Sequence, residues 1–320
     1  MWKSLVLLTL LGPGLAPVPV EPLMHMAADT TRLEVVTAEA SLARGAMRHD
    51  VADARYLALG AQPQFASVGL LRHGSSPLAS AILVAPQWVL TAGHAVDGVD
   101  PKHVTVALGG WTHEAVQVVM HPDFRRRRIG NGTDLALVRL AVPVFDVRPA
   151  RRYRGYAERG QIGTAVGFGV AGVGSDAMLT PAPSGTKRAG TNAVDAIGGV
   201  IDGRRVPDNL LVADFDRPGD PSHNRTGSPI PLDLEYMPLG GDSGGGLFVE
   251  SNGAWFLCGV FSGYTFSAGK ALEIGMYGSL MFWTRLSLYN DWVDATTAAP
   301  KLAGTDLRPS PLAGRRTGVR

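Results

Sequence analysis

The stretch GGDSGGGL, at residues 240–247, sets one serine, Ser243, in a run of glycines. Two earlier stretches belong with it: WVLTAGHA, at residues 88–95, contains His94, and TDLALVRL contains Asp134 as its second residue. Each stretch taken alone fits a structural residue, such as a buried histidine, a cap at a strand end or a glycine-rich turn. The three together in one chain point to a hydrolytic site.

Amide hydrolysis needs a nucleophile, a base that takes its proton, and a group that orients the base. A serine hydroxyl is too weak an acid to attack unaided near neutral pH, but a neutral imidazole can accept its proton. A buried carboxylate then holds the imidazole in the right tautomer. We therefore predict that Ser243, His94 and Asp134 form a catalytic triad.

The order of these residues along the chain selects the fold. The segment GDSGG around Ser243 also matches the G-x-S-x-G nucleophile elbow of α/β-hydrolases, in which the histidine follows the serine. The last histidine of this chain is His223, which precedes Ser243. The α/β-hydrolase fold is therefore excluded, and the order histidine, aspartate, serine is that of chymotrypsin.

The motifs themselves carry a family resemblance. TAGH around His94 is similar to the family's TAAH, DLAL resembles its DIAL, and GDSGG is its nucleophile motif unchanged. The chain thus resembles chymotrypsin/trypsin-like serine proteases over about residues 63–293. The resemblance implies an all-β fold of two six-stranded antiparallel β-barrels with a C-terminal helix. It places the barrels at about 63–150 and 151–283 and the helix at about 284–294.

The same resemblance implies the roles of single residues. Ser243 would be the nucleophile, His94 the general base and then acid, and Asp134 the orienting carboxylate. The backbone N–H groups of Gly241 and Ser243 would form the oxyanion hole. In many members a freed N-terminal ammonium pairs with the aspartate before the nucleophile, here Asp242. No Ile-Val-Gly-Gly occurs, so either an unrecognised N-terminus or local hydrogen bonds hold that carboxylate.

Substrate preference would rest on the primary specificity pocket. Trypsin-like members carry an aspartate six residues before the nucleophile, where this chain has Met237. Ser262, Gly263 and Tyr264 correspond to the family's Ser-Trp-Gly pocket wall, and Met281 stands for a second wall glycine. These replacements predict cleavage after a small or modest apolar side chain, and not after lysine or arginine.

Cysteine usage indicates a fold without disulfides. Cys258 is the only cysteine, in an apolar run that predicts a small buried residue. At the places where the family commonly has a disulfide, the chain has Ala79 and Ala95.

Residues 1–28 read as a signal peptide, with Lys3 before a short apolar run. The expected location is therefore secreted or periplasmic, in a bacterium.

The remaining segments complete the expected organisation. Residues 29–62 are expected to be a pro-segment or N-terminal extension, residues 63–294 the protease domain, and residues 295–320 a disordered tail. The arginine run at 125–128 is expected to be a solvated loop. The segment at 214–220, rich in aspartate, is expected to be a polar surface loop and not a calcium site.

The expected function is a secreted serine endopeptidase that acts on polypeptides through an acyl-enzyme. Two alternatives stay open: a catalytically inactive binding protein of the same fold, and an esterase using the same triad. A formal net charge of +2 gives no reason to expect nucleic acid as a partner. No metal, no cofactor and no membrane association are expected, and the chain is predicted to be a monomer.

Local patterns predict individual elements. Alternating apolar residues and short apolar runs between turn residues favour strands. One amphipathic segment favours a helix at 284–294. The predicted strands are 79–84, 88–91, 104–108, 114–118, 163–168, 210–215, 246–249 and 255–261.

Overall fold

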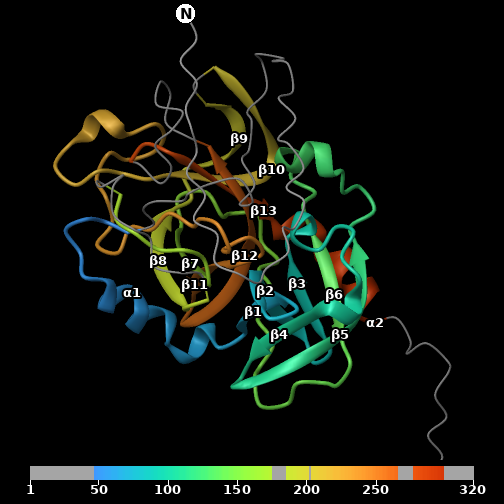
Figure 1. The fold of residues 1–320 in the computed structure, drawn as a ribbon. Coiled ribbons are helices and arrows are strands. Elements are labelled where there is room, and N and C mark those ends of the chain that lie inside the picture. Colours follow the sequence, from blue (N-terminus) through green and yellow to red (C-terminus); the bar gives the residue numbers. More distant parts are fainter. Residues whose placement is uncertain (1–46, 175–184, 202, 266–276, 299–320) are drawn as a thin grey trace, which may run out of the picture. The chain divides into compact units, whose positions relative to one another are not determined.

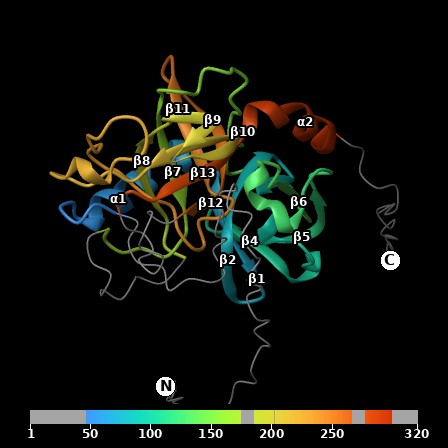
Figure 2. The same cartoon turned by 90° about the horizontal axis from the view of Figure 1, so that it is seen from above.

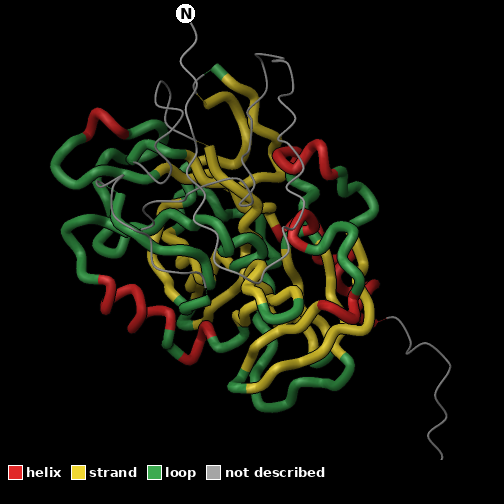
Figure 3. The backbone as a smooth tube through the Cα atoms, in the orientation of Figure 1, coloured by secondary structure: helices red, strands yellow, loops and turns green. Residues whose placement is uncertain are grey.

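The computed structural model of the protein describes residues 47–174, 185–201, 203–265 and 277–298. All of them belong to the unit formed by residues 31–320, which is separate from residues 1–30. The predicted signal peptide, and the predicted tail from residue 299 onward, lie outside the described residues. The described part consists mainly of strands and loops, with a few short helices (Figure 3).

The first half of the described chain is a closed barrel with the strand order β1-β2-β3-β6-β5-β4. Side chains along a strand point alternately into the barrel and outward. In β4, Val104, Val106 and Leu108 are buried, and the residues between them are half-exposed. The strands are β1 (Val68–His73), β2 (Ser76–Ala85), β3 (Trp88–Thr91), β4 (Val104–Leu108), β5 (Trp111–Met120) and β6 (Ala136–Leu140).

The second half is a seven-stranded sheet with the order β8-β7-β11-β12-β13-β10-β9. All of its neighbouring strands pair antiparallel. Figures 1 and 2 show it beside the first barrel. The strands are β7 (Ile162–Gly167), β8 (Arg188–Ala193), β9 (Ala196–Ile201), β10 (Arg204–Asp214), β11 (Gly246–Ser251), β12 (Ala254–Thr265) and β13 (Leu280–Arg285).

The two edge strands of this sheet continue one another. Only Val194 and Asp195 separate β8 from β9, and the Asp195 N–H donates to Val212 O of β10 at 2.9 Å. β8 pairs with β7 while β9 pairs with β10, so one bent strand joins both edges of the sheet. The all-β, chymotrypsin-like prediction is confirmed. Where a sixth strand was expected, the chain has this strand bent into two.

Four hydrophobic clusters of described residues correspond to this arrangement, and the smallest of them packs β9, β10 and β13 together. One fills the first barrel and includes Ala79 and Ala95, so the positions where the family has cysteines are packed with small apolar residues. A second fills the sheet of the other half and includes the buried Cys258. A third contains Ile82 from β2 together with Val260 from β12, and thus joins the two halves.

The helices differ from the prediction at both ends of the chain. Thr284 and Arg285 still belong to β13, a 3-10 helix covers Leu286–Tyr289, and α2 spans Asn290–Ala298. The expected tail therefore starts as helix. At the other end, α1 (Asp53–Gly60) packs against β8, with Gly60 nearly touching the Arg188 backbone. The predicted extension is thus part of the folded unit from Met47 onward. Neither described helix is long and apolar enough to cross a membrane.

Candidate active site

The three candidate residues come from the ends of strands in both halves. His94 lies in the 3-10 helix Gly93–Ala95, which directly follows β3. Asp134 lies just before β6, the strand that pairs with β3. Ser243 lies in the turn before β11. The pairing of β3 with β6 brings the histidine and the aspartate together, and contact between the halves adds the serine.

The three side chains form one hydrogen-bonded chain. Asp134 Oδ2 lies 2.6 Å from His94 Nδ1, and His94 Nε2 lies 2.9 Å from Ser243 Oγ. Asp134 Oδ1 also accepts the backbone N–H of His94 at 2.8 Å. Their exposed fractions are 9% for His94, 1% for Asp134 and 3% for Ser243. The carboxylate is thus buried and fixed at two points against the histidine.

Ser262 adds a further hydrogen bond to this chain. The sequence predicts Ser262 as a residue of the pocket wall. Its hydroxyl donates to Asp134 Oδ2 at 2.6 Å, and the residue is buried. The Ser262 hydroxyl is therefore directed at the Asp134 carboxylate.

The turn around Ser243 lies tightly against the first barrel. The Ser80 N–H of β2 donates to Ser243 O at 2.8 Å. Gly244 has φ of +80°, and a Cβ there would lie 2.2 Å from Thr91 Oγ1 and 2.3 Å from Ser80 O. Glycine is thus required at Gly244 by both conformation and space.

The two predicted oxyanion donors have no acceptor within the described residues. Gly241 N–H and Ser243 N–H make no hydrogen bond there, while the neighbouring Asp242, Gly244 and Gly245 N–H groups all have backbone acceptors. Gly241 has φ of +90°. Its carbonyl accepts the Ser80 hydroxyl at 3.0 Å. Both free N–H groups are therefore available to a ligand oxygen.

The residues predicted to form the specificity pocket are packed into the core. Met237, Tyr264 and Met281 all have an exposed fraction of 0% and belong to the same hydrophobic cluster. Gly263 pairs with Phe282, and Tyr264 with Met281, across β12 and β13. These three predicted pocket residues are therefore part of the hydrophobic core of the second half.

The carboxylate of Asp242, whose partner the sequence left open, is held by local groups. Gly169 N–H donates to Oδ1 at 2.8 Å, and Leu239 N–H and the Tyr236 hydroxyl donate to Oδ2 at 2.9 and 3.1 Å. Burial raises the pKa of Asp242 to about 6, although these three hydrogen bonds act in the opposite direction.

The prediction that residues 214–220 form a polar surface loop is partly wrong. Asp214 and Asp216 are buried, with exposed fractions of 1% and 6%. Asp214 ends β10 and accepts the Thr226 N–H, while Glu235 accepts the Asp216 N–H. The later segment that contains Thr226 and Glu235 folds back against these residues. Composition alone could not predict this burial. No group of three or more metal-binding side chains occurs among the described residues.

The arginine run is solvated where its side chains are described, as predicted, but it is not entirely a loop, because a 3-10 helix covers Arg126–Asn131. Arg125 and Arg126 are exposed. Arg126 lies 3.7 Å from Asp97, a separation typical of a weak surface ion pair.

Two residues that contribute to the site were not predicted from the sequence. Ser80 fixes the Gly241 carbonyl, and Tyr236 binds Asp242. Neither lies in a motif, and both act through side-chain contacts between distant segments. The closely spaced Gly167 and Gly169 were the only local signal, since glycine often marks a close approach of another group.

Fold and site together define a hydrolase of the serine-protease type. Comparison with protein families matches residues 60–221 to the Trypsin family model. The chain belongs to the trypsin family. The matched span includes His94 and Asp134 and ends before Ser243, so the link to the serine comes from the geometry.

Proposed function

We propose that the chain is an active serine endopeptidase in which His94, Asp134 and Ser243 form the catalytic triad. The observation that carries the proposal is the continuous hydrogen-bonded chain from Asp134 through His94 to Ser243 Oγ, with distances of 2.6 and 2.9 Å. Membership of the trypsin family supports peptides as substrates.

The geometry assigns each atom a task. Asp134 accepts a hydrogen bond from the N–H at His94 Nδ1, which leaves the Nε2 lone pair facing the Ser243 hydroxyl. As Oγ bonds to the substrate carbonyl carbon, its proton moves to Nε2 and the carbonyl oxygen takes up the negative charge. The same proton then passes to the leaving nitrogen as the C–N bond breaks, and an acyl-enzyme remains.

The free N–H groups of Gly241 and Ser243 would receive the negative oxygen. One such donor contributes about 3–4 kcal/mol to the transition state in comparable sites. A water molecule, deprotonated by His94, then attacks the acyl carbon and releases Ser243 with its proton restored.

We further propose that the enzyme prefers a small or modest apolar residue on the acyl side of the cleaved bond. Met237 removes the carboxylate that would bind a basic side chain, and Tyr264 and Met281 fill the space of a deep pocket. A cleavage profile dominated by arginine or lysine would contradict this preference.

We propose export of the chain as well, because the short apolar run after Lys3 has the form of a signal peptide. N-terminal sequencing of the mature protein tests it. A mature chain that begins at Met1 would contradict it.

Hydrolysis of an unfolded protein substrate tests the central proposal. Ser243→Ala should reduce cleavage to the background rate, whereas Ser75→Ala, at an exposed loop serine, should leave it unchanged. Equal activity of Ser243→Ala and the wild type would overturn the triad assignment. Folded wild-type protein without any activity would favour a binding protein instead.

A further inference from the structure

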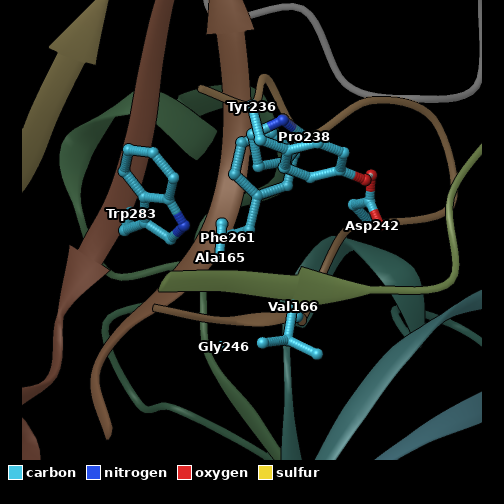
Figure 4. Close-up of a pocket in the computed structure, with 9 residues that line it drawn as sticks. Ala165, Val166, Tyr236, Pro238, Asp242, Gly246, Phe261 and Trp283 are labelled. Carbon is cyan, nitrogen blue, oxygen red and sulfur yellow. Dashed lines mark hydrogen bonds between the residues drawn. The ribbon is translucent and has the colours of Figure 1, made fainter. Parts of the chain in front are cut away.

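The carboxylate of Asp242 lies in a closed polar site next to the turn that contains Ser243. Its three donors come from three directions: Gly169 from the loop after β7, Leu239 from the turn itself, and Tyr236 from the segment before it. Figure 4 shows the Tyr236 ring with its hydroxyl directed at Asp242. Asp242 has an exposed fraction of 2%.

No space remains there for an additional group. A Cβ on Gly167 would lie 2.2 Å from Asp242 Oδ1, and one on Gly169 would lie 2.3 Å from Oδ2. The pocket lined by Tyr236, Pro238 and Asp242 in Figure 4 is too small for a water molecule. An ammonium group, which is about as large as a water molecule, does not fit into this pocket among the described residues.

A buried stretch of backbone at Met47 also lies beside this site. Met47 is buried and bridges to both Val173 and Tyr236. Its backbone N–H donates to Gly172 O at 3.1 Å, and its carbonyl accepts the Gly174 N–H at 2.9 Å. The backbone N–H and carbonyl of Met47, next to Tyr236, thus already form ordinary amide hydrogen bonds.

We infer that Tyr236 is a positioning residue that holds Asp242, and through it the Gly241 and Ser243 N–H groups, so that no freed N-terminal ammonium is needed for activity. The inference rests on the proposed function and concerns its regulation. The oxyanion-binding turn is fixed at both ends of the Gly241–Asp242 unit, by the Ser80 hydroxyl on the Gly241 carbonyl and by the Tyr236 hydroxyl on the Asp242 carboxylate.

The charges around Asp242 agree with this arrangement. Arg188 lies within electrostatic reach of both Asp242 and Tyr236, but its guanidinium makes two hydrogen bonds to Asp53 of α1, at 2.7 and 2.8 Å. The cation therefore assists from a distance while tyrosine and backbone N–H groups make the direct contacts.

Tyr236→Phe tests the role of the hydroxyl. A hydrogen bond to a charged group is lost, so we expect kcat to fall about tenfold or more with little change in KM. Because that hydrogen bond lowers the pKa of Asp242, the acid limb of the kcat/KM profile should also move to higher pH. Unchanged kcat and an unchanged pH profile would overturn the inference.

Tyr56→Phe is the matched control. The Tyr56 hydroxyl accepts the Arg48 N–H and donates to Glu235 O, so the substitution also removes buried hydrogen bonds but none on Asp242. It should lower stability and leave the pH profile in place. An equal shift of the profile in both variants would mean a general structural effect and would refute the specific role of Tyr236.

Acetylation of the α-amino group of the mature wild-type protein tests the second half of the inference. We expect unchanged turnover, whereas loss of activity would overturn it. Hydrogen exchange of the peptide that covers Leu239 adds a readout without catalysis: exchange should accelerate in Tyr236→Phe and not in Tyr56→Phe. Faster exchange in a protein that hydrolyses nothing would refute the proposed function and leave the role of Tyr236 standing.

Discussion

Asp134 accepts three hydrogen bonds from two residues. The His94 N–H binds Oδ1, while His94 Nδ1 and the Ser262 hydroxyl both bind Oδ2. Such saturation fixes the carboxylate, and the carboxylate fixes the tautomer of His94. In the proposed mechanism, the reactivity of Ser243 therefore depends on a carboxylate that does not touch the substrate.

Asp134→Asn should preserve the fold and lower kcat by about 10⁴-fold, because an amide nitrogen facing Nδ1 favours the wrong imidazole tautomer. Steady-state kinetics with an unchanged thermal midpoint would confirm this. A loss of less than about tenfold would mean that Asp134 does not orient His94.

Tyr264→Ala should widen the cleavage preference. Removing the ring opens space beside Met281, so cleavage after leucine or phenylalanine should appear in a proteome digest. The buried ring also packs the core, and we expect a stability loss of about 3–5 kcal/mol. An unchanged profile in the folded variant would show that Tyr264 does not limit the pocket.

Among the secondary-structure elements, the sequence predicted best those strands with clear alternation or bounding turns. β3 and β4 agree with their predicted ranges, and β2 extends beyond its predicted range at both ends. β8 was missed because the glycine and polar residues of Arg188–Ala193 give no apolar period, and β9 because two adjacent glycines interrupt Ala196–Ile201. Helix α1 was missed because its own weak pattern forms a helix only against β8.

The same contrast holds for the site. Triad residues lie in motifs that read directly, and their chain order determined the fold class. Ser262 lay in the predicted region, but its hydroxyl contacts Asp134; it lies at the register shift between Phe261 and Gly263 in the pairing of β12 with β13, which no local pattern predicts. Ser80 and Tyr236 depend on contacts between segments far apart in the chain, which no local pattern encodes.

The C-terminal helix α2 should loosen in mild acid. The ring of His121 packs edge-on against Tyr289 and Trp292, both at 4.9 Å, and its Nδ1 accepts the Asp123 N–H. Burial lowers the pKa of His121. Its stabilising contribution is therefore complete above the unfolded pKa of 6.5 and is lost as pH falls through the lower folded value.

Hydrogen exchange of α2, corrected for intrinsic rates, measures this effect. Protection should drop between about pH 7 and pH 5, and His121→Phe should remove the pH dependence. Asp294 of α2, which pairs with Arg154, adds no pH dependence of its own in that range, because its pKa is lowered and it stays ionised. Equal pH dependence in wild type and variant would exclude His121 as the cause.

For the whole molecule, buried carboxyl groups in the second half should make stability fall as pH rises. Burial is the main cause in each case, and the charge of Asp214 also raises the pKa of Asp195, Asp216 and Glu235. Burial raises the pKa of Asp195 and Glu235 to about 8, of Asp216 to about 7 and of Asp214 to about 6. These groups favour the folded state fully below their unfolded values near 4 and lose that contribution through pH 6–8.

Urea unfolding at a series of pH values tests this expectation. The free energy of unfolding of the wild type should decline from about pH 5 to pH 8, and Asp195→Asn should make that decline shallower by at most about 1.4 kcal/mol per pH unit. If the variant declines as steeply as the wild type, Asp195 does not hold a proton in the folded state.

The two halves meet where Ser243 reaches His94, and the central claim is that this meeting makes a reactive serine. Labelling with a fluorophosphonate, followed by mass spectrometry of the modified peptide, measures it most directly. The arrangement predicts one adduct, on Ser243, which Asp134→Asn slows and Ser243→Ala abolishes. No adduct on the folded wild-type protein, or an adduct on another serine, would contradict the claim.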